Sequence, residues 1–268
     1  MPGIRETPML ALLILACSNK ITVVADDTAG AVLEDTAPPE PEVDYTGATL
    51  VITSPRSGDF LPLGEAATFS AEVRSPAGEP LPFEEIVWTT DVTPTWTLTG
   101  ARAEDATLPV GTHALTATAT LPNGDRVGFG VGGILVQSAY AGIYVGTLSV
   151  EGTAEYNGTP IVTACSGALT LVVDAQGETA VGDSSCPLNL FGFEVDTSYV
   201  FDLENDEGDL AGETEVQVYG FGAVSFDVEG EVTEDGALSG AFAGDVYGFL
   251  AVEGDFAIER VTRDVSGR

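Results

Sequence analysis

The sequence predicts an all-β protein with two consecutive domains, an Ig-like β-sandwich followed by an antiparallel meander barrel. Three observations lead to this prediction. From about residue 48 onward the chain consists of short runs that alternate apolar and polar residues, turn-forming residues separate the runs, and no helical repeat of useful length interrupts them. The 268 residues are enough for two domains of ordinary size, and a hydrophobic content of 44% is enough to fill their cores.

The first predicted domain covers residues 48–137. Its expected strands are TLVITSP, ATFSAEV, EEIVWTT, THALTATAT and RVGFGVGGILV. In the third of these, Ile86 and Trp88 share a face, so we expect Trp88 at the centre of the sandwich. In the fourth, Leu115 and the two alanines that follow at alternate positions point inward, while the threonines point to solvent.

A family resemblance supports this interpretation of the first domain. The order ITSPRSGDFLPLGEAATFSAEV, VWTT, LPVGTHALTATATLPNGD resembles the Ig-like and PKD-like domains of bacterial surface proteins. The resemblance implies the sandwich fold and a role as a spacer or adhesion module. It implies no active site, because the family shares none and a fold alone does not define a function.

The second predicted domain covers residues 138–264. Nine alternating segments follow one another with short links such as NG, AQG, NDEG and EDG, which predicts an antiparallel meander. Eight or nine such strands close into a barrel that hides its edges, and a second two-sheet sandwich is the alternative. The pattern weakly resembles the small lipocalin-like or transferrin-binding-protein-like barrels of lipoproteins, without their diagnostic motifs.

Aromatic residues are frequent in this second domain. Burial is where aromatic rings stabilise most, so most of them are expected in the core, and the remainder to line an apolar cavity or a sugar-stacking surface. The set is Tyr144, Phe193, Tyr199, Phe201, Tyr219, Phe221, Tyr247 and Phe249.

The segment 1–16 reads as a lipoprotein signal peptide. Its apolar run MLALLILA spans about 12 Å as a helix, well short of the roughly 20 residues that a membrane span requires. The sequence ILAC that ends at Cys17 resembles the bacterial lipobox, and this resemblance implies that Cys17 becomes the lipid-modified N-terminus. An ordinary secretory signal and a retained structural segment are the alternatives. Ser18 after the cysteine implies the outer membrane by the sorting rule of that family.

Residues 17–47 are predicted to form an acidic, disordered tether. Their acids repel one another, and Pro38, Pro39 and Pro41 favour an extended chain.

The charge of the chain is strongly one-sided. It has 42 Asp and Glu against 9 Lys and Arg, a net charge of −33, and no Lys, Arg or His from Val127 through Glu259. Such a surface repels phosphate backbones, so the sequence argues against nucleic-acid binding. The excess acid is explained by solubility or by a salty exterior, and the sharper alternative is specific cation binding.

Three groups of residues are candidates for special roles. Cys165 and Cys186 bracket a predicted hairpin that carries its ends back together, so they are expected to form a disulfide. His113, the only histidine, is expected to be structural. A weak Ca²⁺ site is the alternative to a solvated hairpin tip in DLENDEGDL, where the spacing departs from that of an EF-hand. Its possible ligands are Asp202, Glu204, Asp206 and Asp209.

The sequence therefore predicts a lipid-anchored cell-envelope protein of a Gram-negative bacterium, with a non-catalytic structural, adhesion or binding role. Its partners are the membrane, through the lipid, and a protein or glycan that the sequence does not identify. The alternative is a carrier of a small hydrophobic or glycan ligand, which needs an enclosed cavity in the barrel. An enzyme is the third hypothesis for the function. No catalytic residue and no cofactor other than Ca²⁺ is predicted.

Overall fold

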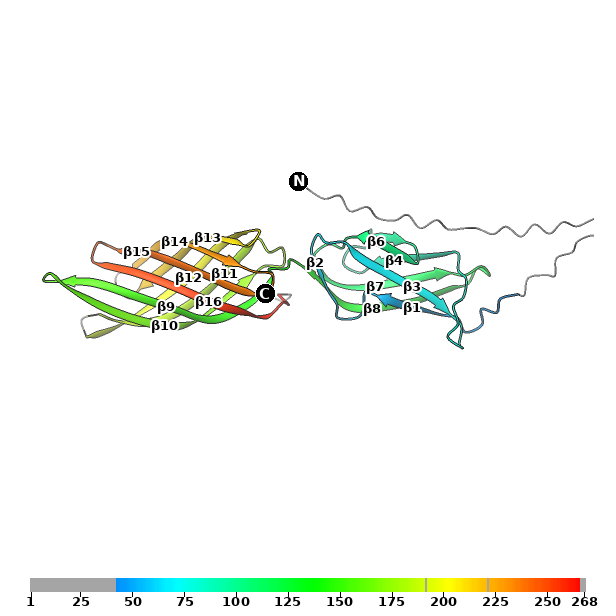
Figure 1. The fold of residues 1–268 in the computed structure, drawn as a ribbon, viewed down its shortest axis with the longest axis horizontal. Helices are drawn as coiled ribbons and strands as arrows, with labels where there is room; N and C mark the ends of the chain where they lie inside the picture. The colour runs from blue at the N-terminus through cyan, green and yellow to red at the C-terminus, as the bar shows by residue number, and fades with distance from the viewer. Residues whose placement is uncertain (1–41, 191, 221, 266–268) are drawn as a thin grey trace, which may run out of the picture. The chain divides into compact units, whose positions relative to one another are not determined.

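The computed structural model describes residues 42–190, 192–220 and 222–265. The expected signal peptide, Cys17 and residues 17–41 of the expected tether lie outside these residues. Every regular element in the described part is a β-strand, and the strands form a two-sheet sandwich and a closed barrel (Figure 1). The predicted fold class is thus confirmed. None of the described residues forms a helix that is long and apolar enough to cross a membrane.

The sandwich consists of a three-stranded and a five-stranded sheet. All its strand pairs are antiparallel except β2 with β8. The smaller sheet has the order β1 (Thr49–Ser54), β3 (Ala67–Arg74), β6 (Arg102–Ala106). The larger has the order β2 (Phe60–Pro62), β8 (Arg126–Gln137), β7 (Gly111–Thr120), β4 (Glu85–Thr90), β5 (Thr97–Thr99).

Trp88 lies at the centre of the sandwich core, as predicted. It is completely buried, its indole N–H donates to the Gly100 carbonyl at 2.9 Å, and its ring packs edge-on against Phe69 with centroids 5.6 Å apart. Leu115 and the alanines at alternate positions after it are also fully buried. The period-two pattern therefore identified the inward face of β7 correctly.

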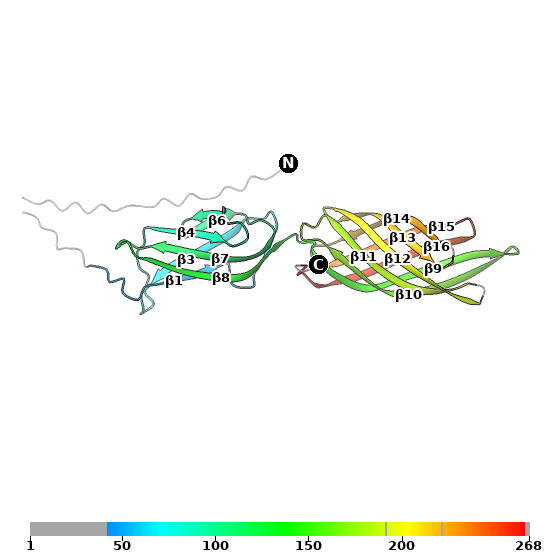
Figure 2. The same cartoon turned by 180° about the vertical axis from the view of Figure 1, so that it is seen from behind.

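The barrel is a simple meander in which each strand pairs with the next and β16 closes onto β9. Figures 1 and 2 show its strands coiling around a common axis from opposite sides. The strands are β9 (Gly142–Tyr156), β10 (Thr159–Val173), β11 (Thr179–Leu190), β12 (Phe193–Asp206), β13 (Asp209–Val218), β14 (Gly222–Val232), β15 (Ala237–Val246) and β16 (Leu250–Thr262).

One detail of the predicted meander is wrong. The last two of the nine alternating segments, YGFLAVEG and DFAIERV, do not form separate strands: both contribute to β16, and Gly254 at the end of the first lies within the strand. This glycine faces the interior, where a Cβ atom would come within 2.2 Å of the Phe242 ring. The glycine is there to make room for an aromatic ring, and no turn occurs.

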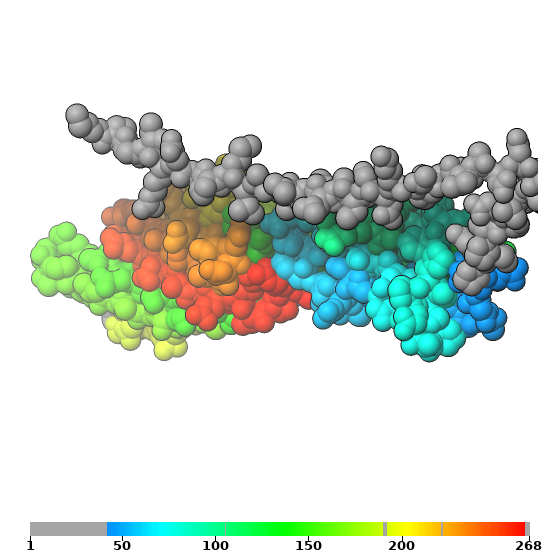
Figure 3. Space-filling model, turned by 45° about the vertical axis from the view of Figure 1, so that its right-hand side comes forward, coloured from blue at the N-terminus to red at the C-terminus, as the bar shows by residue number. Residues whose placement is uncertain are grey.

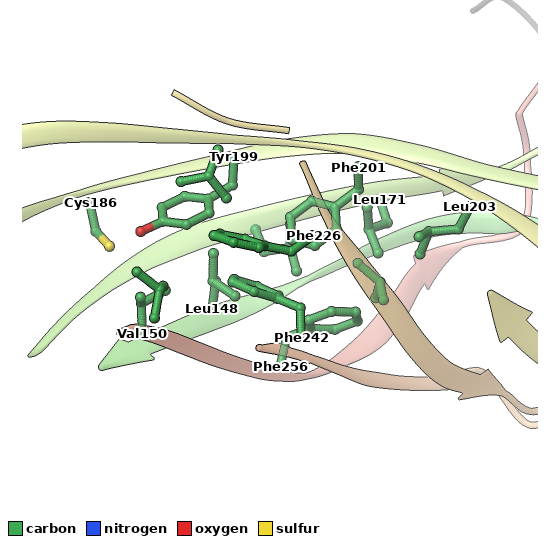
Figure 4. Close-up of a cluster of buried hydrophobic side chains, with 14 of the residues drawn as sticks. Leu148, Val150, Leu171, Cys186, Tyr199, Phe201, Leu203, Phe226, Phe242 and Phe256 are labelled. Atoms are coloured by element: carbon green, nitrogen blue, oxygen red, sulfur yellow. The ribbon is translucent and has the colours of Figure 1, made fainter. Parts of the chain in front are cut away.

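The barrel interior is packed with aromatic rings (Figure 4). Phe201 lies 5.5 Å from Phe256 and 6.2 Å from Phe242 between ring centroids, and Phe226 stacks on Phe242 at 6.1 Å. Inward-facing glycines lie opposite these rings: a Cβ on Gly244 would meet Phe226 at 2.0 Å. Large and small residues thus alternate across facing strands and fill the centre, as close packing requires.

Candidate functional site: the aromatic end of the barrel

The barrel has two chemically different ends. Because the strands alternate in direction, the tips of the hairpins β9–β10, β11–β12, β13–β14 and β15–β16 all lie at one end, which Figure 1 shows at the left. Exposed aromatic side chains gather on these tips, and we call them the aromatic rim. Its members, with their exposed fractions, are Tyr219 (81%), Phe193 (73%), Tyr247 (62%), Tyr156 (59%) and Phe249 (36%). Figure 3 shows the β9–β10 tip, in green, projecting beyond the rest of the barrel.

The sequence reveals why the rim forms where it does. An aromatic residue, a glycine and a phenylalanine follow one another at residues 191–193, 219–221 and 247–249. The three glycines have φ values of 85°, 86° and 75°, in the left-handed region that turns require and that favours glycine. The described residues beside these glycines, Phe193, Tyr219, Tyr247 and Phe249, lie at the hairpin tips and are exposed.

The expectation that most aromatic residues of this domain are buried needs correction at the tips. Tyr144, Tyr199 and Phe201 are buried as expected, whereas the rim residues Phe193, Tyr219 and Tyr247 are not. Alternation predicts the direction of a side chain only inside a strand, and these three residues lie in or beside turns. The signal that identifies them is the repeated aromatic-Gly-Phe sequence.

Hydrogen bonds hold the tips of the rim in place. The Tyr219 amide donates to the Asp196 carbonyl at 3.1 Å, which joins the β13–β14 tip to β12. The Tyr247 hydroxyl donates to the Ala223 carbonyl at 3.4 Å, which joins the β15–β16 tip to β14. These links join Tyr219 and Tyr247 to neighbouring strands of the barrel.

A hollow of about 590 Å³ lies on the outside of β11, β12 and β13, directly beside Tyr219. We call it the Tyr219 hollow. Its lining combines hydroxyl, amide and carboxylate groups with the exposed tyrosine. The lining residues are Ser185, Cys186, Pro187, Asp196, Thr197, Ser198, Gln217, Val218, Tyr219, Gly220 and Gly222.

A second, larger hollow of about 1110 Å³ lies on the outside of the strands from β14 through β16 to β9 and β10. Its outward-facing lining consists of small residues and acids, and Glu253 lies directly opposite Glu151 in the strand register. Like charges in opposed positions destabilise a sheet. Its acids are Glu151, Asp227, Glu229, Glu253 and Asp255.

The predicted disulfide is present. Cys165 in β10 and Cys186 in β11 are bonded, with their Cα atoms 5.8 Å apart, and Cys186 is buried in the barrel core. The bond lies in the half of the barrel that carries the rim, because Cys186 also borders the Tyr219 hollow. A disulfide links the two strands there.

His113 has a structural environment. Its Nε2 donates to the Pro109 carbonyl, which can only accept, at 2.7 Å, and its Nδ1 forms a hydrogen bond with the Thr90 hydroxyl, also at 2.7 Å. Both of its nitrogens are used inside the sandwich, and the ring is buried.

Of the acids proposed for Ca²⁺, only Asp206 and Asp209 lie opposite each other, as a register pair of the β12–β13 hairpin. Asp202, Glu204 and Asp206 follow one another along the exposed face of β12 at alternate positions, and Asp209 begins β13. Alternate residues of a strand are spaced by about 6.6 Å or more. In the described part of the chain no group of three or more His, Cys, Asp or Glu is arranged to hold a metal ion. The Ca²⁺ hypothesis gains no support from these positions and stays a prediction.

The opposite end of the barrel is closed by arginine. Arg260 donates from Nη1 to the Ala139 carbonyl and from Nη2 to the Glu234 carbonyl, both at 2.6 Å, and Arg263 donates to the same two carbonyls. The Arg260 guanidinium also lies over the Tyr144 ring, 5.9 Å from its centroid. These arginines bind backbone carbonyls at this end of the barrel.

Fold and site together define an all-β protein with a two-sheet sandwich and a closed barrel, and the barrel presents aromatic residues at one end. No protein-family model and no curated protein sequence matches the chain. Among solved structures it is similar to fibronectin(III)-like modules of CbhA from Clostridium thermocellum, at 18% identity over 68% of this chain and 92% of that chain, with a TM-score of 0.28. It is also similar to the haemoglobin receptor HpuA from Kingella denitrificans, at 12% identity over 84% of this chain and 96% of that chain, with a TM-score of 0.28. Similarities at this level carry no functional argument, which therefore rests on the residues of this chain.

Proposed function

We propose that the protein is a lipid-anchored, non-catalytic binding protein of the cell envelope, and that it contacts its partner through the aromatic rim. The observation that carries this proposal is the exposure of Phe193, Tyr219 and Tyr247 together at one end of the barrel. Exposed aromatic residues that gather in one place are characteristic of interaction surfaces, where Tyr and Trp are over-represented among the residues that dominate affinity.

The packed interior argues against a ligand carried inside the barrel. The rings of Phe201, Phe226, Phe242 and Phe256 occupy the centre, and inward glycines leave only enough room for them. A small ligand would have to displace these rings. Binding at the outer surface of the barrel is therefore the version of the ligand hypothesis that we retain.

The anchor in this proposal is Cys17, by its resemblance to the lipobox cysteine. Several acyl chains together hold a protein durably on a membrane, since each buried CH₂ contributes about 0.8 kcal/mol. The acidic segment after it would serve as the tether and the sandwich as a spacer. In a Gram-negative host, Cys17→Ala should move the protein from the outer-membrane fraction to the soluble fraction; retention of the variant in the membrane would contradict the anchor.

The binding role is tested with the full chain and a rim variant, Phe193→Ser/Tyr219→Ser/Tyr247→Ser. Three probes are offered: neutral hexasaccharides, an arginine-rich peptide and phosphatidylcholine vesicles. We expect at least one probe to bind the wild type and to lose most of its affinity for the rim variant. Equal binding to both proteins, or no binding of any probe, would overturn the assignment of the rim.

A further inference from the structure

The Tyr219 hollow combines features that suit one class of ligand. It lies where the rim meets the outer face of three strands, and its outward-facing strand residues occupy two rows of the sheet. In one row Ser198 lies opposite Ser185 on β11 and opposite Gln217 on β13. In the next outward-facing row, closer to the tip, Asp196 lies opposite Pro187. The backbone carbonyl of Asp196 accepts the Tyr219 amide proton.

In this arrangement short side chains line the base of the hollow and longer side chains border it. The serine side chains are short, so Ser185 and Ser198 leave space above the sheet between longer neighbours. Gln217 borders that space in its own row, and Tyr219 borders it at the tip with 81% of its surface exposed. Opposed side chains on adjacent strands lie about 5 Å apart, so all these groups are within reach of one small ligand.

The chemistry of the lining matches a polyhydroxylated ligand. The serine hydroxyls both donate and accept, the Gln217 amide donates at one atom and accepts at the other, and the Asp196 carboxylate accepts two hydrogen bonds. A tyrosine ring offers a flat apolar face and a polar tip. Sugars require this combination, because each sugar ring carries hydroxyl groups at its edge and C–H groups on its face.

The negative charge of this surface narrows the class of ligand further. The chain carries no Lys, Arg or His from Val127 through Glu259, so phosphorylated, sulfated or uronic-acid sugars would meet only repulsion at this surface. A cationic peptide, by contrast, would be drawn at least as strongly to the larger hollow, which is lined by Glu151, Asp227 and Glu253. The volume of about 590 Å³ falls within the usual range of small-ligand sites.

We infer that the Tyr219 hollow binds a neutral oligosaccharide, with Tyr219 stacking on a sugar ring and Asp196, Ser198 and Gln217 bonding its hydroxyl groups. This inference rests on the proposed function, because it names the class of partner for the same end of the barrel. It places the ligand on the outside of the sheet, where the polar groups are, and leaves the packed interior undisturbed.

The test measures binding to the full chain by isothermal titration calorimetry and saturation-transfer NMR. The probes are maltohexaose, cellohexaose, laminarihexaose, mannohexaose and chitohexaose, with hexagalacturonate as the anionic comparison. We expect at least one neutral hexasaccharide to bind and hexagalacturonate not to bind. Tyr219→Ala and Gln217→Ala should each weaken the binding by about tenfold or more.

The matched control is Phe129→Ala, which removes an exposed aromatic ring from β8 of the sandwich, outside both the rim and the hollow, and should leave the affinity unchanged. Failure of every neutral hexasaccharide to bind at millimolar concentration would overturn the inference, as would Tyr219→Ala and Gln217→Ala variants that bind like the wild type. If the arginine-rich peptide or the vesicles instead bind in a rim-dependent manner, the glycan inference fails while the proposed function stands. If no probe binds, both fail.

Discussion

The two ends of the barrel are built by the same meander but differ in what their turns contain. At the arginine end the turns are polar and cap themselves: Asp174 accepts the Glu178 amide proton at 2.9 Å, and Asn205 accepts that of Gly208 at 3.0 Å. At the other end the turns carry the aromatic rim. Since polar residues form the turns at the arginine end, hairpin formation alone does not require aromatic rings.

The means of closing the barrel also differ between the ends. Arg260 and Arg263 bind backbone carbonyls at one end, and the Cys165–Cys186 bond joins two strands in the half that carries the rim. We propose that stability and recognition are assigned to different residues of the barrel.

The largest loss of stability is expected from the double substitution Cys165→Ala/Cys186→Ala. Opening a loop of this length should lower the free energy of unfolding by about 3 kcal/mol. Urea denaturation of the oxidised protein measures the loss. Adding a reductant should destabilise the wild type and leave the double variant unchanged; a wild type that is indifferent to the reductant would show that the bond contributes nothing.

At the arginine end, Arg260→Ala should lower the free energy of unfolding by about 2 kcal/mol, because charged hydrogen bonds to backbone carbonyls are lost. Arg126→Ala, an exposed position on β8 of the sandwich, is the matched control and should change stability by less than about 0.5 kcal/mol. Equal effects of the two substitutions in denaturant titrations would contradict the special role of Arg260.

Alkaline pH should destabilise the barrel. Burial raises the pKa of both Tyr144 and Tyr199 above the ordinary value of about 10. A folded-state pKa above the unfolded one gives a stability contribution that is complete below pH 10 and is lost as the pH rises through the folded pKa. Denaturant titrations from pH 8 to 12 should show this fall, and Tyr199→Phe should make it shallower; an unchanged pH profile of that variant would contradict the prediction for Tyr199.

The smallest effect is expected from Ca²⁺. Asp202, Glu204 and Asp206 are spread along the exposed face of β12, so millimolar Ca²⁺ should not raise the thermal midpoint more than the same concentration of Mg²⁺. A saturable rise that is specific for Ca²⁺ and absent in Asp202→Asn would instead establish the site.

Period-two alternation was enough to predict the fold class, the burial of Trp88 and the inward face of β7. The positions of Cys165 and Cys186 were likewise enough to predict their bond. Other features depend on contacts between distant strands. The continuity of β16 through Gly254 could not be predicted, because nothing nearby in the sequence reveals that the Phe242 ring lies against this glycine. The rim was missed because Tyr219 and Tyr247 were judged by residue type, although alternation ends at the turns they occupy.

We propose that the aromatic rings of the rim serve recognition and not folding. The free energy of unfolding of the variant Phe193→Ser/Tyr219→Ser/Tyr247→Ser tests this proposal. Exposed positions contribute little to stability, so urea titration should give a value within about 1 kcal/mol of the wild type, with an unchanged denaturant slope. A loss of about 4 kcal/mol or more would contradict the claim, because losses of that size arise from the truncation of buried aromatic residues.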